Sequence, residues 1–113
     1  MTAERIDSFA AAWLRCDLDE LRDFLTADAL YSPLSGEVVR GREAVVRRFA
    51  ETLADDEGTE VRFEPATVSG SLGTCRWSLW VHTADGASFQ IDGIDVYEFE
   101  GDRIRSKDVY QKA

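Results

Sequence analysis

Arg76, Asp95 and Asp108 are the residues of this chain whose types and spacing best suit chemistry. They fall in three consecutive stretches that alternate apolar and polar residues, which is typical of β-strands. Two carboxylates on neighbouring strands lie roughly 5 Å apart at the backbone, and in an apolar cavity they cannot both ionise easily. One then becomes a general acid and the other a general base. We expect Asp108 to be the base, Asp95 to be the acid or hydrogen-bond donor, and Arg76 to hold one of them anionic.

Two turns set the register that brings these residues together. Asp85-Gly86 is a hairpin signal, and as a two-residue loop it pairs Arg76 with Asp95. Gly101-Asp102 is the next turn, and it pairs Asp95 with Asp108. Because directly paired residues share one face of a sheet, we expect the three charged residues to form a row across neighbouring strands. A slip of one residue at either turn would reverse the face of the affected strand.

The two faces of this predicted sheet differ in composition. The face with the charged row is rich in aromatic residues, as small-molecule pockets are. Together with aromatic residues of the N-terminal half, it supplies the side chains that we expect to bind substrate: Tyr97, Trp80, His82, Trp13, Tyr31, Phe49 and Ser78. The other face is expected to form a homodimer interface through Trp77, Leu79, Val81, Ile94 and Val96.

Purely structural roles for the same residues also stay open. The arginine and the two aspartates also suit a structural salt-bridge network. Trp13, Trp80 and Tyr31 also suit the core, and His82 also suits the rim of the molecule.

The N-terminal half, which must position this row, is predicted to be helical. Asp17 predicts the N-cap of a helix over Leu18–Leu25, and Gly41 precedes a helix from Arg42 to about Ala54. A turn at Ser35-Gly36 predicts a pair of short strands between them. An earlier helix is indicated by apolar residues at three- and four-residue steps: Ile6, Phe9, Ala10, Trp13 and Leu14.

The pattern changes to a period of two from Glu60 onward. Helices followed by a run of antiparallel strands predict an α+β fold, in which a bent sheet wraps against the helices. The length of 113 residues predicts a single domain over residues 1–113, and 44% apolar residues suffice for its core.

Charge and cysteine content exclude several classes of partner. A net charge of −9 argues against nucleic acid and anionic membranes, because both attract clustered Lys and Arg. The chain has no apolar run of membrane-spanning length and its first residues lack the apolar core of a signal peptide, so we expect a cytoplasmic protein. Cys16 and Cys75 show no metal-ligand spacing. We expect two buried free thiols, no metal and no other cofactor.

Two segments carry a family resemblance: DLDELRDFLTADALYSPLSGEVVRGREAVVRRF and DVYEFEGDRIRSKDVYQ. With them placed, the chain resembles the SnoaL-like polyketide cyclase family of the nuclear transport factor 2-like superfamily, which also contains ketosteroid isomerases and limonene epoxide hydrolases. The resemblance spans nearly the whole chain. It implies a cone-shaped α+β barrel, in which a strongly bent, mostly antiparallel sheet wraps around N-terminal helices and encloses a pocket. It also implies frequent dimers.

The resemblance implies a role for each member of the charged row. Asp95 falls where the isomerases keep a protonated aspartic acid that stabilises an oxyanion. Asp108 falls where the cyclases and epoxide hydrolases keep an acid/base aspartate, and Arg76 is similar to the arginine that bridges two aspartates in the hydrolases. Neither set is complete, because three positions depart from the family pattern: Ser32 at the isomerase base, Phe9 at the isomerase tyrosine and Ser78 at the second hydrolase aspartate.

These observations predict a cofactor-independent acid–base enzyme, a cyclase or isomerase that acts on a small hydrophobic oxygenated molecule such as a polyketide or a terpenoid. Two alternatives stay open. One is a non-catalytic ligand-binding or dimerising scaffold domain. The other is an epoxide hydrolase, which would need a water held between Asp108 and a second carboxylate.

Overall fold

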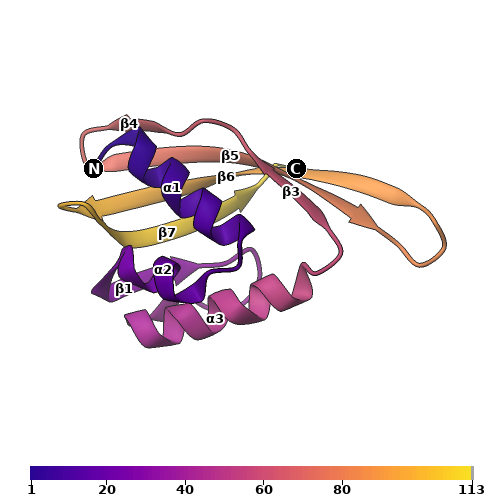
Figure 1. The fold of residues 1–113 in the computed structure, drawn as a ribbon, viewed down its shortest axis with the longest axis horizontal. Coiled ribbons are helices and arrows are strands. Elements are labelled where there is room, and N and C mark those ends of the chain that lie inside the picture. The colour runs from indigo at the N-terminus through magenta and orange to yellow at the C-terminus, as the bar shows by residue number, and fades with distance from the viewer. Residues whose placement is uncertain (113) are drawn as a thin grey trace.

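The structure is a computed structural model that describes residues 1–112, and it pairs three helices with one bent sheet (Figure 1). The helices are α1 (Ala3–Leu14), α2 (Leu18–Asp23) and α3 (Arg42–Asp55). The strands are β1 (Leu25–Ser32), β2 (Val39–Arg40), β3 (Glu60–Phe63), β4 (Thr67–Ser69), β5 (Leu72–His82), β6 (Ser88–Glu100) and β7 (Arg103–Gln111). They form a seven-stranded sheet in the order β2-β1-β7-β6-β5-β3, with β4 paired to β5. Only β1 and β7 run parallel among these pairs, so the predicted α+β class with a mostly antiparallel sheet is confirmed.

The helix boundaries follow the capping residues. Asp17 caps α2 by accepting a hydrogen bond from the backbone N–H of Glu20 at 3.1 Å, as the sequence predicted. The helix stops at Asp23 instead of Leu25, because Leu25 already pairs with Ile104 of β7. Gly41 precedes α3 as expected, with a φ of 90°.

Helix α1 ends in a left-handed turn that is closed by a cysteine. The N–H of Cys16 donates to the carbonyl of Trp13 at 3.0 Å, and the N–H of Asp17 donates to the carbonyl of Ala12 at 3.1 Å. This is a Schellman motif, whose left-handed position usually holds glycine but here holds Cys16 with a φ of 55°. Because this position lies outside the helix, Cys16 is exposed, and the prediction that both thiols are buried is wrong for Cys16 and confirmed for Cys75.

The core lies between the helices and the concave face of the sheet. Phe9 of α1 stands at its centre, with edge-to-face contacts to Phe24, Phe49 and Tyr97 at centroid distances of 5.5, 6.1 and 5.8 Å. Aliphatic side chains complete this core: Ile6, Leu21, Leu25, Val45 and Ile104. The helices are thereby fixed against the sheet, and any cavity between them has rigid walls.

The turn between β6 and β7 has the predicted length, but the register behind it shifts. Glu100 pairs with Arg103 across the two-residue turn. Phe99 then pairs with Ile104, whereas Glu98 pairs with Ser106, so Arg105 is the extra residue of a β-bulge. From the bulge onward Asp95 lies opposite Val109 instead of Asp108.

The loop between β5 and β6 is longer than predicted. His82 pairs with Ser88, which leaves five residues, Thr83–Ala87, in the loop. The Asp85 carboxylate closes it by accepting hydrogen bonds from the Ala87 N–H and the Thr83 hydroxyl. The change in loop length moves β5 by one residue relative to β6, so that Arg76 pairs with Ile94 and Cys75 pairs with Asp95.

These two shifts correct the central prediction from the sequence. Arg76, Asp95 and Asp108 do not form a row, because pairing places Arg76 beside Ile94 and Asp108 beside Val96 on the face opposite to Asp95. The residues of β6 face the predicted sides of the sheet. The residues of β5, and those of β7 beyond the bulge, face the opposite sides from the ones predicted.

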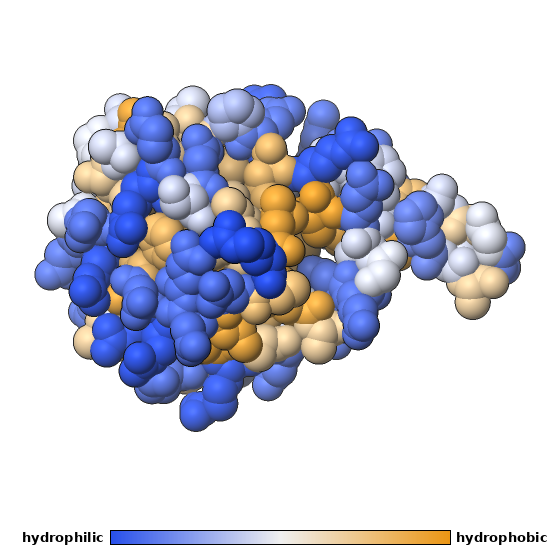
Figure 2. All heavy atoms as spheres, in the orientation of Figure 1, coloured by the Kyte–Doolittle hydropathy of each residue, from blue (hydrophilic) through white to orange (hydrophobic). Residues whose placement is uncertain are grey.

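The β5–β6 hairpin projects beyond the rest of the fold, which gives the molecule extents of 46 × 27 × 25 Å (Figure 1). Hydrophilic residues cover most of the face seen in Figure 2, and hydrophobic residues gather in a hollow between α1 and the segment that joins α3 to β3. Over residues 1–112, none of the helices combines the length and the apolar character that crossing a membrane requires.

Candidate functional site

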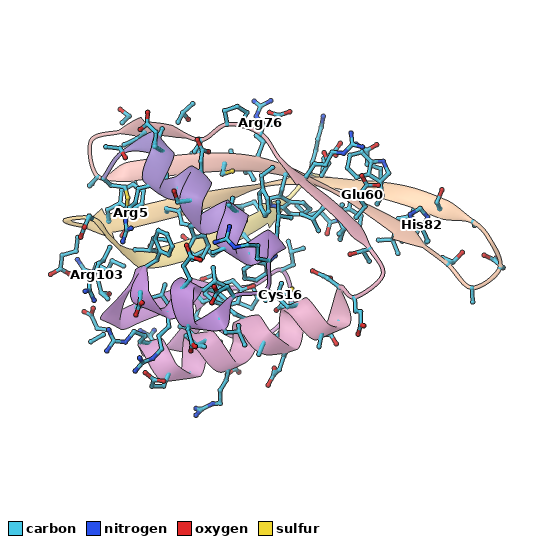
Figure 3. The ribbon with its side chains drawn as sticks, viewed as in Figure 1. Arg5, Cys16, Glu60, Arg76, His82 and Arg103 are labelled. Atoms are coloured by element: carbon cyan, nitrogen blue, oxygen red, sulfur yellow. The ribbon has the colours of Figure 1, made fainter. Side chains whose placement is uncertain are left out.

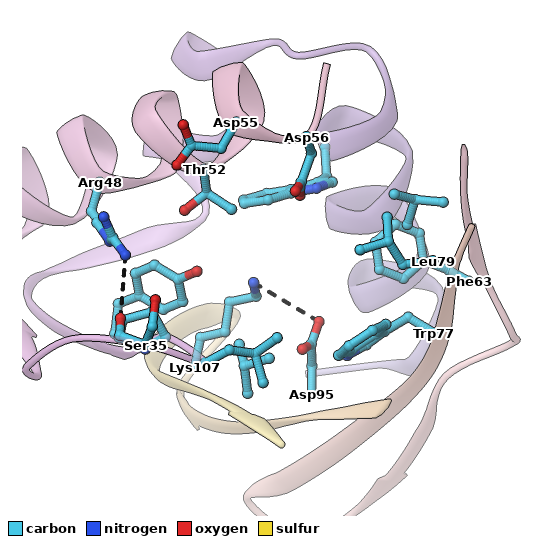
Figure 4. Close-up of a pocket in the computed structure, with 16 residues that line it drawn as sticks. Ser35, Arg48, Thr52, Asp55, Asp56, Phe63, Trp77, Leu79, Asp95 and Lys107 are labelled. Carbon is cyan, nitrogen blue, oxygen red and sulfur yellow. Dashed lines mark hydrogen bonds and ion pairs between the residues drawn. The ribbon is translucent and has the colours of Figure 1, made fainter. Parts of the chain in front are cut away.

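A cavity of about 220 Å³ lies between helix α3, the end of α1 and the concave face of the sheet (Figure 4). Asp95 of β6 and Lys107 of β7 are its buried polar residues. Its walls are apolar and come from Trp13, Tyr31, Val61, Phe63, Trp77, Leu79 and Val109. The mouth of the cavity is formed by polar residues of the β1–β2 connection and of α3 and its C-terminal end: Ser35, Arg48, Thr52, Asp55 and Asp56. Ionisable groups inside an apolar wall are the usual composition of a binding or catalytic pocket.

Asp95 is the buried carboxylate of this cavity and is only 3% exposed. Burial raises its pKa, because the ionised form loses its hydration. The Lys107 ammonium and the Tyr97 hydroxyl act against that rise. Tyr97 donates a hydrogen bond to Asp95 Oδ2 at 3.2 Å, and burial keeps the pKa of Tyr97 well above its ordinary value. Asp95 is therefore a carboxylate of raised basicity, oriented by a phenol that stays protonated.

Lys107 is the cation that faces Asp95, with Nζ 3.9 Å from Asp95 Oδ2. Its ammonium lies 4.4 Å from the ring centroid of Trp13, 5.0 Å from that of Tyr31 and 5.4 Å from that of Phe49. Aromatic faces attract cations, and the effect grows when water is excluded. The three rings of Trp13, Tyr31 and Phe49 thus form an aromatic cage around the Lys107 ammonium.

Two hydrogen-bond donors of the cavity have no acceptor within residues 1–112. The distance of 3.9 Å from Lys107 Nζ to Asp95 is too long for a hydrogen bond. The buried Nε1 of Trp77 also lacks a partner, although the ring lies beside Asp95 (Figure 4). For the buried Trp77 N–H, the missing partner carries a free-energy cost of about 1–3 kcal/mol, which a ligand oxygen would remove. Both donors therefore favour an oxygen atom bound beside Asp95.

The mouth carries a second carboxylate at the C-terminal end of α3. Asp56 is half-buried, and burial together with the neighbouring Asp55 raises its pKa, whereas Lys107 lowers it. Arg48 on the same helix is tied to the Ser35 carbonyl at 3.2 Å and to Glu51 at 3.2 Å. Lys107 is thus placed between a deep carboxylate and one nearer to solvent (Figure 4).

The structure brings together some of the predicted site residues. Asp95, Trp13 and Tyr31 line the cavity. Tyr97 and Phe49 lie directly behind its lining, where they contact Asp95 and Lys107.

The other predicted site residues lie elsewhere. Ser78 shares the outer face with Arg76 and donates its hydroxyl to Asp92 at 2.8 Å. Trp80 packs against Arg62 at 5.0 Å, and His82 is exposed at the base of the projecting loop (Figure 3). Because Arg76 and Asp108 lie away from the cavity, the aspartate–arginine–aspartate arrangement implied by the resemblance is not formed.

The predicted dimer face is divided between the two sides of the sheet. Trp77 and Leu79 line the cavity, whereas Ile94 and Val96 lie on the outer face. Val81 belongs to the projecting hairpin. A homodimer stays a prediction, and the surface proposed for it must be redrawn.

Two residues of the site were missed by sequence reasoning. Lys107 was overlooked because the assumed register turned it outward, yet it directly precedes Asp108, so the two must face opposite sides of the strand. Asp56 was not among the predicted site residues. The available signal was its place at the end of a helix, where an acidic residue opposes the helix dipole and calls for another explanation.

These features define a class of small α+β proteins that enclose a partly polar cavity between helices and a curved sheet. A family model for the SnoaL-like domain matches residues 6–107, and the chain belongs to this family. No curated protein matches the chain.

Solved structures share the fold. A nuclear transport factor 2-like protein of unknown function from Mesorhizobium loti is 26% identical, with a TM-score of 0.78 over 98% of this chain and 90% of that one. The epoxide hydrolase/cyclase-like enzyme SalBIII, of pyran ring formation in the polyether salinomycin, is 16% identical, with a TM-score of 0.78 over 96% and 88%. A Pseudomonas putida protein suggested to be a polyketide cyclase is 18% identical, with a TM-score of 0.73 over 99% and 92%. At these identities the last two support the fold, within a family that includes cyclase-type proteins.

Proposed function

We propose that this protein is an acid–base enzyme of the cyclase or isomerase type, in which Asp95 removes a proton next to a carbonyl group of a small hydrophobic substrate. The observation that carries the proposal is the buried Asp95 carboxylate, which lies 3.9 Å from the Lys107 ammonium and beside the Trp77 N–H, a donor without a hydrogen-bond partner. This replaces the predicted use of Asp108 and Arg76.

The chemistry follows from the positions of these groups. The substrate carbonyl oxygen binds at Lys107 Nζ, and the neighbouring C–H bond faces Asp95. The C–H bond breaks, its proton passes to Asp95, and the electron pair moves onto the oxygen as an enolate that the ammonium stabilises. In a cyclisation the enolate carbon attacks a second electrophilic carbon, and in an isomerisation Asp95 returns the proton to another carbon.

The cavity also limits the substrate. A volume of about 220 Å³ lies below the roughly 300–1,000 Å³ of pockets for drug-sized ligands. The substrate, or the part of it that reacts, is therefore smaller than a drug-sized molecule. The apolar walls favour a hydrocarbon skeleton, and the two donors favour one oxygen function at its end.

The experiment uses 5-nitrobenzisoxazole, a small apolar probe that needs only a base. Removal of its ring C–H proton breaks the N–O bond and releases a coloured cyanophenolate, so no knowledge of the natural substrate is required. We expect Asp95→Asn to lower the catalysed rate by ~10² or more, the usual size of general-base assistance. The rate should rise with pH through a pKa above the ordinary value of an aspartate, because burial raises the pKa of Asp95.

The matched control is Asp108→Asn, which removes a carboxylate from the opposite face of the same sheet. It should keep the wild-type rate. Circular dichroism of each variant verifies the fold. Equal rates for Asp95→Asn and wild type would remove the proposed base and favour a ligand-binding role for the cavity.

A further inference from the structure

Lysine is rare in this chain, and one of its two lysines lies inside the cavity. The sequence has 13 lysine and arginine residues, of which only Lys107 and Lys112 are lysines. The guanidinium of arginine is not a nucleophile in proteins, whereas the primary amine of a lysine can attack a carbonyl carbon once a neighbouring base has taken its proton. A chain that uses arginine almost everywhere else thus places a primary amine at the bottom of its pocket.

We propose that Lys107 captures an aldehyde or ketone as a covalent imine, and that Asp95 serves as its proton shuttle. The inference rests on the proposed function, because it concerns the same carbonyl substrate and the same cavity. It adds a covalent bond where the simpler mechanism has only an ion–oxygen contact.

The position of the amine supports this role. Lys107 is 5% exposed and lines the cavity, so a carbonyl compound that enters meets its Nζ. Asp95 Oδ2 lies 3.9 Å from Nζ and can accept a proton from the ammonium. The raised basicity of this buried carboxylate favours that transfer. Asp56 at the mouth lies on the side toward α3 and is not required to move a proton.

The step balances as follows. The ammonium gives one proton to Asp95, and the neutral amine forms a C–N bond while the carbonyl electron pair moves to oxygen. That oxygen takes a proton from the attacking nitrogen, which gives a neutral carbinolamine. Asp95 then protonates the hydroxyl group, the C–O bond breaks, and water leaves. The products are a protonated imine and the original Asp95 carboxylate, which is free to remove the adjacent C–H proton and form an enamine.

The aromatic cage stabilises a positive charge on Nζ both before the reaction, in the ammonium, and after it, in the protonated imine. Trp13, Tyr31 and Phe49 surround Nζ at 4.4 to 5.4 Å and attract the ammonium. The protonated imine carries the same positive charge on the same nitrogen, so the cage stabilises it as well. The enamine is a carbon nucleophile and serves the ring closure for which the enolate was proposed.

The test traps the imine chemically. The native protein is incubated with benzaldehyde and sodium cyanoborohydride, whose hydride reduces an imine to a benzylamine that mass spectrometry locates by peptide mapping. We expect Lys107 to be the principal labelled lysine, although Lys112 is exposed and Lys107 is buried. Labelling in urea, where both amines are free, should lose this preference. Asp95→Asn should reduce Lys107 labelling to the level of Lys112, and Lys112→Arg should leave it unchanged.

Each outcome bears on the inference. Labelling of Lys107 no greater than that of Lys112 in the native wild type overturns it, and this comparison needs no variant. The benzisoxazole probe has no carbonyl group, so its turnover depends on the Asp95 base and not on an imine. Benzisoxazole turnover without Lys107 labelling would remove the covalent step alone. Lys107 labelling without benzisoxazole turnover would instead remove the proposed base.

Discussion

Replacing Lys107 with methionine tests whether the ion pair between Lys107 and Asp95 raises or lowers the free energy of unfolding. The side chains of Lys107 and Asp95 are 6% and 5% exposed, so the pair belongs to the buried class of ion pairs. Surface pairs contribute only about 0–1 kcal/mol, whereas removing one partner of a buried pair costs ~3–5 kcal/mol. Methionine fills the aromatic cage without charge and with a similar length.

The expected free energies differ between the single and double variants. Lys107→Met leaves Asp95 buried without a cation, and Asp95→Asn leaves Lys107 buried without an anion, so each should lose ~3–5 kcal/mol of unfolding free energy. The double variant has no buried charge at this point and should lose less than either single variant. The singles would sum to ~6–10 kcal/mol, so the coupling between the two sites should reach several kcal/mol.

Acidity should restore part of the stability of Lys107→Met. Burial raises the folded-state pKa of Asp95 above its unfolded value, and loss of Lys107 removes the cation that opposed this rise. Between those two pKa values the folded protein binds more protons than the unfolded chain, so its stability rises as the pH falls. The destabilisation at neutral pH should therefore shrink as the pH is lowered toward the ordinary pKa of aspartate. The double variant has no carboxyl at this site and should lack this response.

Urea denaturation followed by tryptophan fluorescence measures all four proteins, with midpoints and slopes compared at neutral and mildly acidic pH. An additive double variant, or single variants that lose less than about 1 kcal/mol, would show that water screens the pair and that the cavity is wetter than its apolar lining indicates.

One thiol titration and two substitutions test the structure around the cavity and at the end of α1. Burial raises the pKa of Cys75 to about 12, so Ellman's reagent should titrate one thiol, Cys16, in the native protein and two after unfolding; two fast thiols in the native state would contradict this. Gly93→Ala should cost ~1–3 kcal/mol in urea denaturation, because the new Cβ would lie 2.1 Å from the Trp77 ring and 2.3 Å from the Tyr110 carbonyl oxygen, and an unchanged midpoint would contradict that packing. Cys16→Gly should raise stability by about 1 kcal/mol, because glycine adopts the left-handed conformation without strain; a loss would show that the thiol makes a favourable contact.

The helical part of the fold was predictable because its signals are local. Asp17 and Gly41 mark helix starts through groups within three or four residues, and the predicted starts of α2 and α3 agree with the structure. Helix ends depend on partners far along the chain. Leu25 leaves α2 for β1 because Ile104 of β7 offers it a backbone partner, and no local pattern announces that competition.

The faces of the sheet were predictable for strand β6 and for the start of β7, but not for β5 or for β7 beyond the bulge. Asp95 and Tyr97 were placed together on the pocket side, and both are buried there. The prediction was wrong for the neighbouring strand β5, because the side of the sheet that its residues face depends on whether the connecting loop has an even or an odd number of residues. A carboxylate that closes a five-residue loop at Thr83–Ala87 looks in sequence like a two-residue Asp-Gly turn. The three additional residues of the loop shift the pairing of β5 with β6 by one residue, so the side chains of β5 face the opposite side of the sheet from the one predicted.

The bulge at Arg105 connects that error to function. Without it, β7 would continue the register of its turn, and Asp108 would lie opposite Asp95 as the sequence predicted. Two carboxylates would then meet without a cation between them. With the bulge, the preceding residue, Lys107, turns inward, and the cavity holds one base and one amine instead of two acids. A β-bulge re-aims side chains at the cost of a ladder hydrogen bond, and such features gather next to active sites. The chemistry proposed for this pocket therefore depends on one inserted residue, Arg105, which does not line the pocket. Turn lengths alone identify the correct strands, but they place Asp108 in the pocket where the bulge places Lys107.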